Sequence, residues 1–447
     1  MKKIVLLVVA LAVCVGCAKL SGPPPMPVYL IAVDTLRADA LSCYGGKHPT
    51  PALDRFAQQA VLFEHCLAPS SWTVPSMASL MTGLYPFHHG TTKALQEYGR
   101  VLSQQTLNNG YTTLAEAMKE AGYRTYGISA NGHLAEKYGF AQGFDEYVVH
   151  EFTPRQAVAG SWAGLLPRLT GEQRFGQAVF AFLFFFDPHH PYMPQQPYID
   201  AYDPDWRKQL EVLPSHDLGN LQRDGFFEKH KAVVPHLRAA YDSEVTALDA
   251  YLGELLPTLP GYHDALVIVT ADHGESFDEH GVMVHGNNVY EPETHIPLMI
   301  KLPQGRLAGT RIAAPVSLVD VMPTILAAVK SPKRPKSDGV SLLPLLVGQA
   351  GERAVYSAID LPWARQRAML RWPFKTVLID EKTVQLFDLS QDPTEGKDLA
   401  AAHPQAKAWA EQLRAATNNE VRFPPRVISG EIPDHLKKKL RELGYVH

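Results

Sequence analysis

Residues 265–275 read Ala-Leu-Val-Ile-Val-Thr-Ala-Asp-His-Gly-Glu, an apolar and β-branched run that ends in polar side chains. The run Ala265 to Thr270 predicts a strand buried on both faces of a mainly parallel sheet. Open α/β sheets place their ligand groups at the carboxyl ends of such strands, which is where Asp272 and His273 stand. A carboxylate and a neutral imidazole both bind divalent metals, and Gly274 permits a sharp turn beside the ion. The stretch therefore predicts an α/β protein with a metal site at the edge of its sheet.

Two further apolar runs end in groups suited to the same edge. Val28 to Val33 precedes Asp34, and Ala178 to Phe186 precedes a segment that contains the pair His189-His190. Both runs predict buried parallel strands, whose carboxyl ends meet at one edge of a sheet. We expect Asp34 and His189 to lie near the Asp-His-Gly motif. The alternative is that both histidines only line a loop.

The segment Ser70 to Gly83 reads Ser-Ser-Trp-Thr-Val-Pro-Ser-Met-Ala-Ser-Leu-Met-Thr-Gly. Pro75 favours the first turn of a helix, and Gly83 is typical of a helix end. Thr73 therefore lies at or just before a helix N-terminus, where free N–H groups and the helix dipole favour an anion. Two interpretations stay open on these residues alone: the Thr73 hydroxyl meets a phosphate or sulfate, or it only caps the helix.

The run Thr73-Val-Pro-Ser-Met77, followed by Thr82-Gly83, resembles the signature of the sulfatases, a branch of the alkaline phosphatase superfamily. The family core is Cys or Ser, any residue, Pro, Ser and Arg. In the family the Cys or Ser is oxidised to formylglycine by an enzyme that also needs the Arg. Thr73 and Met77 depart from both positions, and a secondary alcohol cannot become that aldehyde. The resemblance therefore points to a sulfatase variant with threonine at the position of the usual nucleophile.

The resemblance extends from Val28 to the C-terminus. Motifs similar to those of the family are Asp34-Thr35 with the segment through Cys43-Tyr44-Gly45, Asp272-His273-Gly274, Val319 to Thr324 and Leu386 to Leu389. The resemblance implies an α/β, alkaline phosphatase-like fold, in which helices sandwich a mainly parallel sheet over residues 28–350. A small α+β subdomain is expected over residues 351–447.

The resemblance also implies roles for individual side chains. Asp34, Asp272 and His273, with Thr73 Oγ1 and the hydroxyl of Thr35, would hold one divalent metal ion, Ca²⁺, Mn²⁺, Mg²⁺ or Zn²⁺. The sequence shows no additional Asp and His set that requires a second zinc. The substrate is expected to be an anionic ester, with its oxygens bound by His189, His133 and Asn131 and its leaving group protonated by His285. Asn131 stands where the family carries a Lys, so it supplies no charge, and His280 is a weaker alternative to His285.

Three functions fit these residues. The first is a metal-dependent hydrolase of phosphate, phosphonate or sulfate esters, with Thr73 as nucleophile and phosphorus substrates favoured. The second is a transferase of phosphoryl-alcohol groups, of the phosphoglycerol type, that acts on envelope lipids or glycans. The third is a non-catalytic binding lipoprotein, which the altered positions Thr35, Thr73, Met77 and Asn131 motivate.

Composition and the N-terminus indicate the class of protein and its location. The chain has 447 residues, 46% hydrophobic and 20% charged, and its formal charge of −4 argues against a nucleic-acid partner. Residues 1–16 resemble a lipoprotein signal peptide, and residues 17–27 a Pro-rich tether. Cys17 follows small residues and would carry a lipid anchor to a membrane of the bacterial cell envelope, on the periplasmic side or the cell surface; ordinary secretion is the alternative. Cys43 and Cys66 remain, and they could pair.

Overall fold

The structure is a computed structural model that describes residues 25–92, 94–97, 100–151, 153, 155–214, 218–349, 351–418 and 421–429. The predicted signal peptide and Cys17 lie outside the described residues, so the lipid anchor stays a prediction. Within these ranges, no helix combines the length and the apolar character that crossing a membrane requires. Cys43 and Cys66 form no disulfide with any residue that the structure describes.

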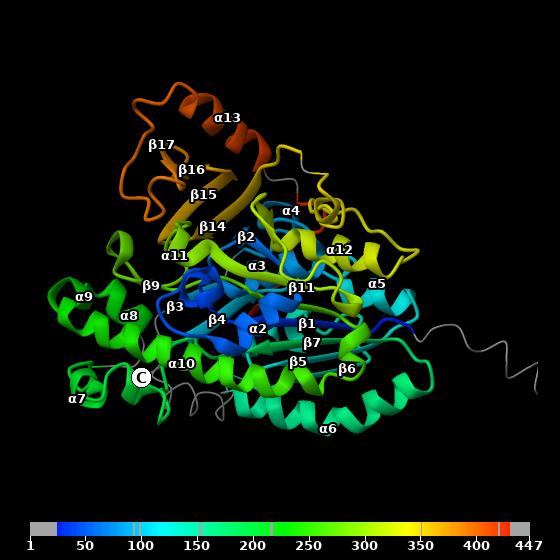
Figure 1. The fold of residues 1–447 in the computed structure, drawn as a ribbon. Helices are drawn as coiled ribbons and strands as arrows, with labels where there is room; N and C mark the ends of the chain where they lie inside the picture. Colours follow the sequence, from blue (N-terminus) through cyan, green and yellow to red (C-terminus); the bar gives the residue numbers. More distant parts are fainter. Residues whose placement is uncertain are drawn as a thin grey trace, which may run out of the picture.

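A nine-stranded sheet forms the centre of the molecule (Figure 1). Its order is β12-β2-β11-β8-β1-β7-β5-β6, with β13 beside β2, and only β11 runs antiparallel to its neighbours. The expected mainly parallel sheet is confirmed. The strands are β1 (Val28–Val33), β2 (Val61–Leu67), β5 (Arg124–Ser129), β6 (Glu146–Val149), β7 (Val179–Phe185), β8 (Leu266–Ala271), β11 (His295–Lys301), β12 (Arg311–Ile312) and β13 (Val316–Ser317).

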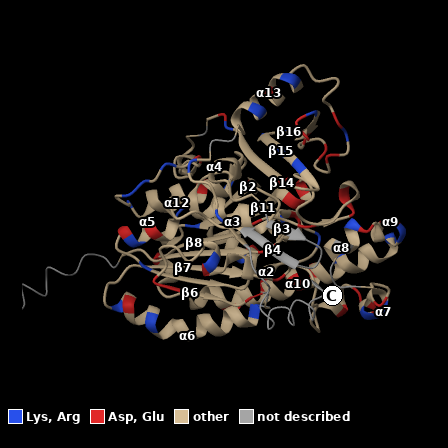
Figure 2. Ribbon diagram, turned by 180° about the vertical axis from the view of Figure 1, so that it is seen from behind, with Lys and Arg blue, Asp and Glu red and all other residues tan. Residues whose placement is uncertain are grey.

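Helices cover both faces of this sheet, as expected. Every residue of β1, β7 and β8 is buried, which explains why these strands read as continuous apolar runs. In Figure 1 the lower face carries α6 (Arg155–Arg174) and α10 (Val234–Leu255), against which α2 (Pro51–Gln59) packs. The upper face carries α3 (Thr73–Thr82), α5 (Leu114–Glu120) and α12 (Val321–Ala328). Charged residues lie mainly on helices and loops, with both signs interspersed (Figure 2).

The C-terminal subdomain is an antiparallel sheet with one helix packed on it. Its strands are β14 (Val355–Leu361), β15 (Ala364–Arg371), β16 (Phe374–Ile379) and β17 (Thr383–Asp388), and the helix is α13 (Ala406–Ala416). A third sheet joins β3 (Ala94–Glu97), β4 (Arg100–Gln105) and β18 (Val427–Ser429), so the end of the described chain pairs with residues 103–105. The remaining helices and strands are α4 (Pro86–His89), α7 (Trp206–Leu210), α8 (Leu218–Arg223), α9 (Phe226–Lys229), α11 (Glu291–Thr294), β9 (Ser276–Phe277) and β10 (Met283–Val284).

The register of the central strands sets the position of the site. Val33, the last residue of β1, pairs with Phe185 of β7 and with Ala271 of β8. The residues that follow these three strands therefore leave the sheet at the same level. This is the edge at which the sequence predicts the metal ligands.

Candidate active site

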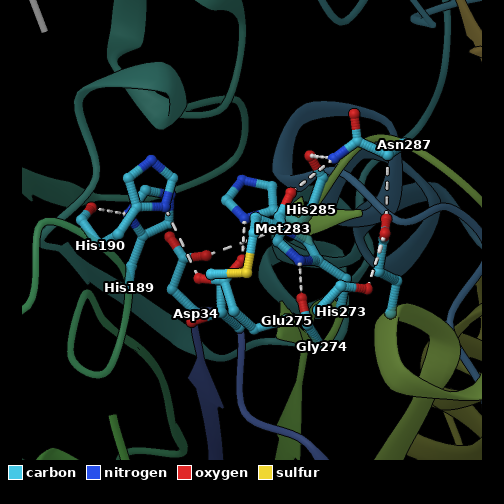
Figure 3. Close-up of polar contacts among 12 residues, drawn as sticks. Asp34, His189, His190, His273, Gly274, Glu275, Met283, His285 and Asn287 are labelled. Atoms are coloured by element: carbon cyan, nitrogen blue, oxygen red, sulfur yellow. Dashed lines mark hydrogen bonds and ion pairs between the residues drawn. The ribbon is translucent and has the colours of Figure 1, made fainter. Parts of the chain in front are cut away.

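Asp34, Asp272 and His273 converge beyond the carboxyl ends of β1 and β8. Figure 3 shows Asp34 and His273 facing each other. His273 Nε2 lies 3.4 Å from Asp272 Oδ2 and 3.7 Å from Asp34 Oδ1, and one ligand atom from each residue lies within 4.8 Å of the other two. The structure thus brings together the three side chains that the sequence predicts as metal ligands.

The electrostatics of this group suit a divalent cation. Among the described residues, Asp34 Oδ1 and Asp272 Oδ2 have no hydrogen-bond partner, although both side chains are fully buried. Burial raises the pKa of Asp34 well above its usual value, and the nearby charge of Asp272 adds to the rise. Burial likewise raises the pKa of Asp272. Buried carboxylates of this kind need a compensating positive charge, which a bound metal supplies. The residues therefore fit a divalent metal, and the identity of the ion stays a prediction.

Thr73 is the first residue of α3, and its side chain is buried beside this group. The N-cap is Trp72, so the alternative interpretation, in which Thr73 only caps the helix, does not hold. Thr73 Oγ1 lies 3.2 Å from His273 Nε2. Ser76 Oγ donates to the carbonyl oxygen of Asp272 over 2.6 Å and ties α3 to the end of β8. The hydroxyl of Thr73 is thereby held at the helix N-terminus and at the metal group together.

The turn after β1 is strained and held from several sides. Thr35 has a φ of 54°, a left-handed conformation that β-branched residues rarely adopt. The Tyr241 hydroxyl, on α10, donates to the Thr35 carbonyl oxygen over 2.9 Å and accepts from Arg37 N over 3.0 Å. Thr35 N donates to Asp272 Oδ1 over 3.2 Å. Such strain persists where the surroundings fix the backbone, often at functional sites. Metal binding by the Thr35 hydroxyl stays a prediction.

Asn131 and His133 follow β5 and border the metal group. Asn131 Nδ2 donates to Asp34 Oδ2 over 2.8 Å, and Asn131 Oδ1 accepts from His133 N over 2.9 Å. The amide thus orients a metal ligand, and its predicted contact with substrate stays a prediction. The His133 ring packs edge-on against Trp72 with ring centroids 5.9 Å apart, and burial lowers the pKa of His133 to about 4.

His189, His190 and His285 form a second group beside the first, which we call the histidine cluster (Figure 3). One ring nitrogen of each lies within 4.8 Å of those of the other two. The His285 ring centroid lies 4.8 Å from that of His189 and 4.5 Å from that of His273. Burial lowers the pKa of His189 well below its usual value and that of His285 to about 4. Both predicted histidines therefore lie near the metal group, while their roles in catalysis stay predictions.

Glu275 supports the histidine cluster, and the sequence did not predict this role. Its buried carboxylate lies 2.8 Å from His285 Nδ1 and 3.6 Å from His190 Nδ1, and it accepts from the Tyr192 hydroxyl over 3.1 Å. Burial by itself raises the pKa of Glu275, but the two imidazoles outweigh it and hold the pKa well below its usual value. The signal that could have indicated the role is an acidic residue two positions after His273.

The weaker alternative to His285 lies elsewhere. His280 stacks on Tyr290 with ring centroids 4.0 Å apart, and its Nε2 lies 4.0 Å from Glu395. In the described part of the chain it belongs to neither candidate metal group. His285 is the histidine of this loop that reaches the site.

Comparisons with known proteins agree with this geometry. A family model described as Sulfatase matches residues 28–331. Steryl-sulfatase of Rattus norvegicus is 26% identical over 420 residues, which cover 74% of this chain and 72% of that protein. The multifunctional alkaline phosphatase superfamily protein PehA of Trinickia caryophylli is 25% identical over 395 residues, which cover 71% of this chain and 76% of that protein.

A solved structure shows the same fold. The phosphonate monoester hydrolase of Agrobacterium radiobacter superposes with a TM-score of 0.69 at 22% identity, covering 91% of this chain and 100% of the other. The alkaline phosphatase-like architecture predicted from the sequence is confirmed. Because the family model matches more than half of the sequence, the chain belongs to the sulfatase family of ester hydrolases.

Proposed function

We propose that this protein hydrolyses phosphate or phosphonate esters in two steps: the Thr73 hydroxyl oxygen attacks phosphorus and displaces the alcohol, and water then releases the phosphorus group from Thr73. The observation that carries the proposal is the position of Thr73 Oγ1, buried at the start of α3 and 3.2 Å from His273 Nε2. His273 Nδ1 lies 2.9 Å from the carbonyl oxygen of Gly274, which can only accept. The proton of His273 therefore sits on Nδ1, and the lone pair of Nε2 faces both the Thr73 hydroxyl and the carboxylates of Asp34 and Asp272, where it would bind the metal.

The surroundings of Thr73 favour an anionic substrate. The first turn of α3 directs free N–H groups and the positive end of its dipole toward the hydroxyl. A divalent metal held by Asp34, Asp272 and His273 would lower the pKa of the hydroxyl and neutralise charge on the ester. Asn131 keeps Asp34 in its orientation, since its amide donates to Asp34 Oδ2.

The preference for phosphorus follows from the single hydroxyl of threonine. A formylglycine hydrate has two hydroxyls, so one can be sulfated while the other expels sulfate by cleavage of the C–O bond. Thr73 has no second hydroxyl, and a sulfated threonine would need attack at sulfur. A phosphothreonine can be resolved by water at phosphorus. The similarity of the chain to a phosphonate monoester hydrolase supports the same preference.

The test measures turnover of an aryl phosphate monoester, an aryl phosphate diester, a phosphonate monoester and an aryl sulfate. We expect a phosphorus ester to be the best substrate, Thr73→Ala to lower its turnover by at least about 100-fold, and Thr73→Ser, which keeps a hydroxyl, to retain more activity. Mass spectrometry of protein quenched during turnover should find a phosphorus-containing adduct on Thr73. If the aryl sulfate is the best substrate and Thr73→Ala retains the rate, the nucleophile is not Thr73.

A further inference from the structure

The histidine cluster has the donor set of a metal site of its own. His189 and His190 follow β7, and His285 follows the β9–β10 hairpin, so three imidazoles from two loops meet in one place. Their side chains are at least nine-tenths buried. Three neutral imidazoles are ligands that Zn²⁺ and similar transition metals prefer, whereas Ca²⁺ and Mg²⁺ prefer oxygen.

The contacts of two of the three rings indicate which nitrogen carries the proton. His285 Nδ1 lies 2.8 Å from Glu275 Oε1, and His190 Nδ1 lies 3.6 Å from Glu275 Oε2. His189 Nδ1 contacts the carbonyl oxygen of His190. In His285 and His189, Nδ1 thus contacts an oxygen that accepts, so these two rings keep their proton on Nδ1 and their lone pair on Nε2, while His190 Nδ1 lies at ion-pair distance from the Glu275 carboxylate. Metal-binding histidines in proteins are oriented in this way, by a carboxylate or a carbonyl behind the ring.

Distances and charge also suit a cation. Zn–N bonds of about 2.1 Å place tetrahedral nitrogen ligands about 3.4 Å apart, so rings whose nitrogens lie within 4.8 Å need only small movements. Glu275 carries the negative charge that balances part of the charge of the ion, and the Tyr192 hydroxyl holds the carboxylate in place over 3.1 Å. Three protein ligands leave a fourth position open for substrate.

We propose that His189, His190 and His285 bind a second divalent transition metal, of the zinc class, next to the Asp34-Asp272-His273 group. The His273 and His285 ring centroids, one from each group, lie 4.5 Å apart. Two ions so placed would clamp an ester between them and stabilise both the attacking and the leaving oxygen. This role rests on the proposed function, but the existence of the site does not.

The experiment counts metal ions. The purified protein is stripped with a chelator, dialysed against a small excess of Zn²⁺ and analysed for zinc per chain. We expect two equivalents in the unaltered protein, one equivalent in His190→Ala and in His285→Ala, and two in the control His280→Ala, a histidine of the same loop outside the cluster. Loading with Co²⁺ gives a second readout, because loss of one tetrahedral site removes part of the visible absorption.

One zinc equivalent in the unaltered protein would overturn the proposal, and so would two equivalents in both cluster variants. If circular dichroism shows that one variant does not fold, the zinc content of the other variant and of the unaltered protein still tests the proposal. Because the readout is the metal count, the outcome is independent of whether phosphorus or sulfur esters are turned over.

Discussion

Asp272 and His273 each supply one ligand to a group with few members, so the loss of either should release the metal. We expect Asp272→Ala and His273→Ala to lose the ion from this group and most ester hydrolysis, because water then reaches a site that is fully buried. Elemental analysis after dialysis against a small excess of Zn²⁺ checks this, and each variant should hold one equivalent per chain fewer than the unaltered protein. Asp39→Asn is the matched control, since the Asp39 side chain is exposed, pairs with the buried Arg37 and lies outside the group. Full metal occupancy in both alanine variants would remove these residues from the site.

Asp34 and Asp272 could be predicted from the sequence because each directly follows a buried strand, and parallel strands bring such ends together. The contact of Glu275 with His285 could not be predicted, because it depends on how the hairpin between them folds back. His190 was given less weight than His189 because neighbouring histidines in a loop look alike in sequence. In the structure the two histidines differ in their partners: His190 Nδ1 faces the Glu275 carboxylate, and His189 Nδ1 contacts the carbonyl oxygen of His190.

At the scale of elements, the central strands β1, β7 and β8 could be predicted to within one residue, since a buried strand is an apolar run with polar ends. The reversed direction of β11 could not, because its run Ile296 to Leu302 reads like that of a parallel strand. The sheet of β3, β4 and β18 was also not predicted. Its partners come from residues 94–105 and 427–429, and short strands so far apart carry no local signal of pairing.

The helix that carries Thr73 is held by a buried histidine, which should make the protein sensitive to acid. His89 Nδ1 accepts from Thr91 N over 3.0 Å, and its Nε2 lies 3.0 Å from Ser79 Oγ on α3. Burial lowers the pKa of His89 to about 3, whereas an unfolded histidine has a pKa of about 6.5. Between these values unfolding takes up a proton, so the contribution to stability is present above pH 6.5 and is lost as the pH falls toward 3.

We therefore expect the free energy of unfolding to fall less steeply between pH 7 and pH 5 in His89→Asn than in the unaltered protein. Because one proton is taken up, the slopes of the free energy of unfolding against pH can differ between the two proteins by at most about 1.4 kcal/mol per pH unit. Asn retains an oxygen that can accept from Thr91 N but has no proton to gain. Urea unfolding at pH 5, 6 and 7 measures the slopes. Equal slopes in the two proteins would show that His89 is not a source of acid sensitivity.

At the scale of the whole molecule, the N-terminal sequence predicts where the enzyme acts. Cys17→Ser should release the protein from the membrane fraction without changing the activity of the solubilised enzyme, because a Pro-rich segment separates the predicted lipid from the catalytic part. Fractionation of cells that express each form, with activity measured in pellet and supernatant, tests this. Recovery of the variant in the membrane pellet would contradict the lipid anchor.

The C-terminal subdomain is joined to the catalytic part through a buried ion-pair group. Lys375 of β16 is fully buried, and its Nζ lies 2.8 Å from Glu291 Oε1 of α11 and 3.0 Å from Glu395 Oε1. Lys375→Met keeps most of the apolar stem but leaves two carboxylates in a buried place without their cation. Breaking such a group by removing one partner costs about 3–5 kcal/mol, so we expect a loss of that order in the free energy of unfolding.

Two further variants distinguish the loss of charge from a loss of packing at this interface. Arg365→Met removes a cation of the neighbouring strand β15 that lies 3.8 Å from Asp360 at the surface, and exposed pairs contribute little, so its stability should hardly change. Adding Glu395→Gln to Lys375→Met removes one of the two buried carboxylates that have lost their cation. The double variant should therefore regain part of the stability, because the side chains of Lys375 and Glu395 are in contact. Urea unfolding of all four proteins provides the comparison. If Lys375→Met unfolds at the same urea concentration as Arg365→Met, the buried ion-pair group does not hold the C-terminal subdomain to the catalytic part. The apolar contacts around the group must then do so.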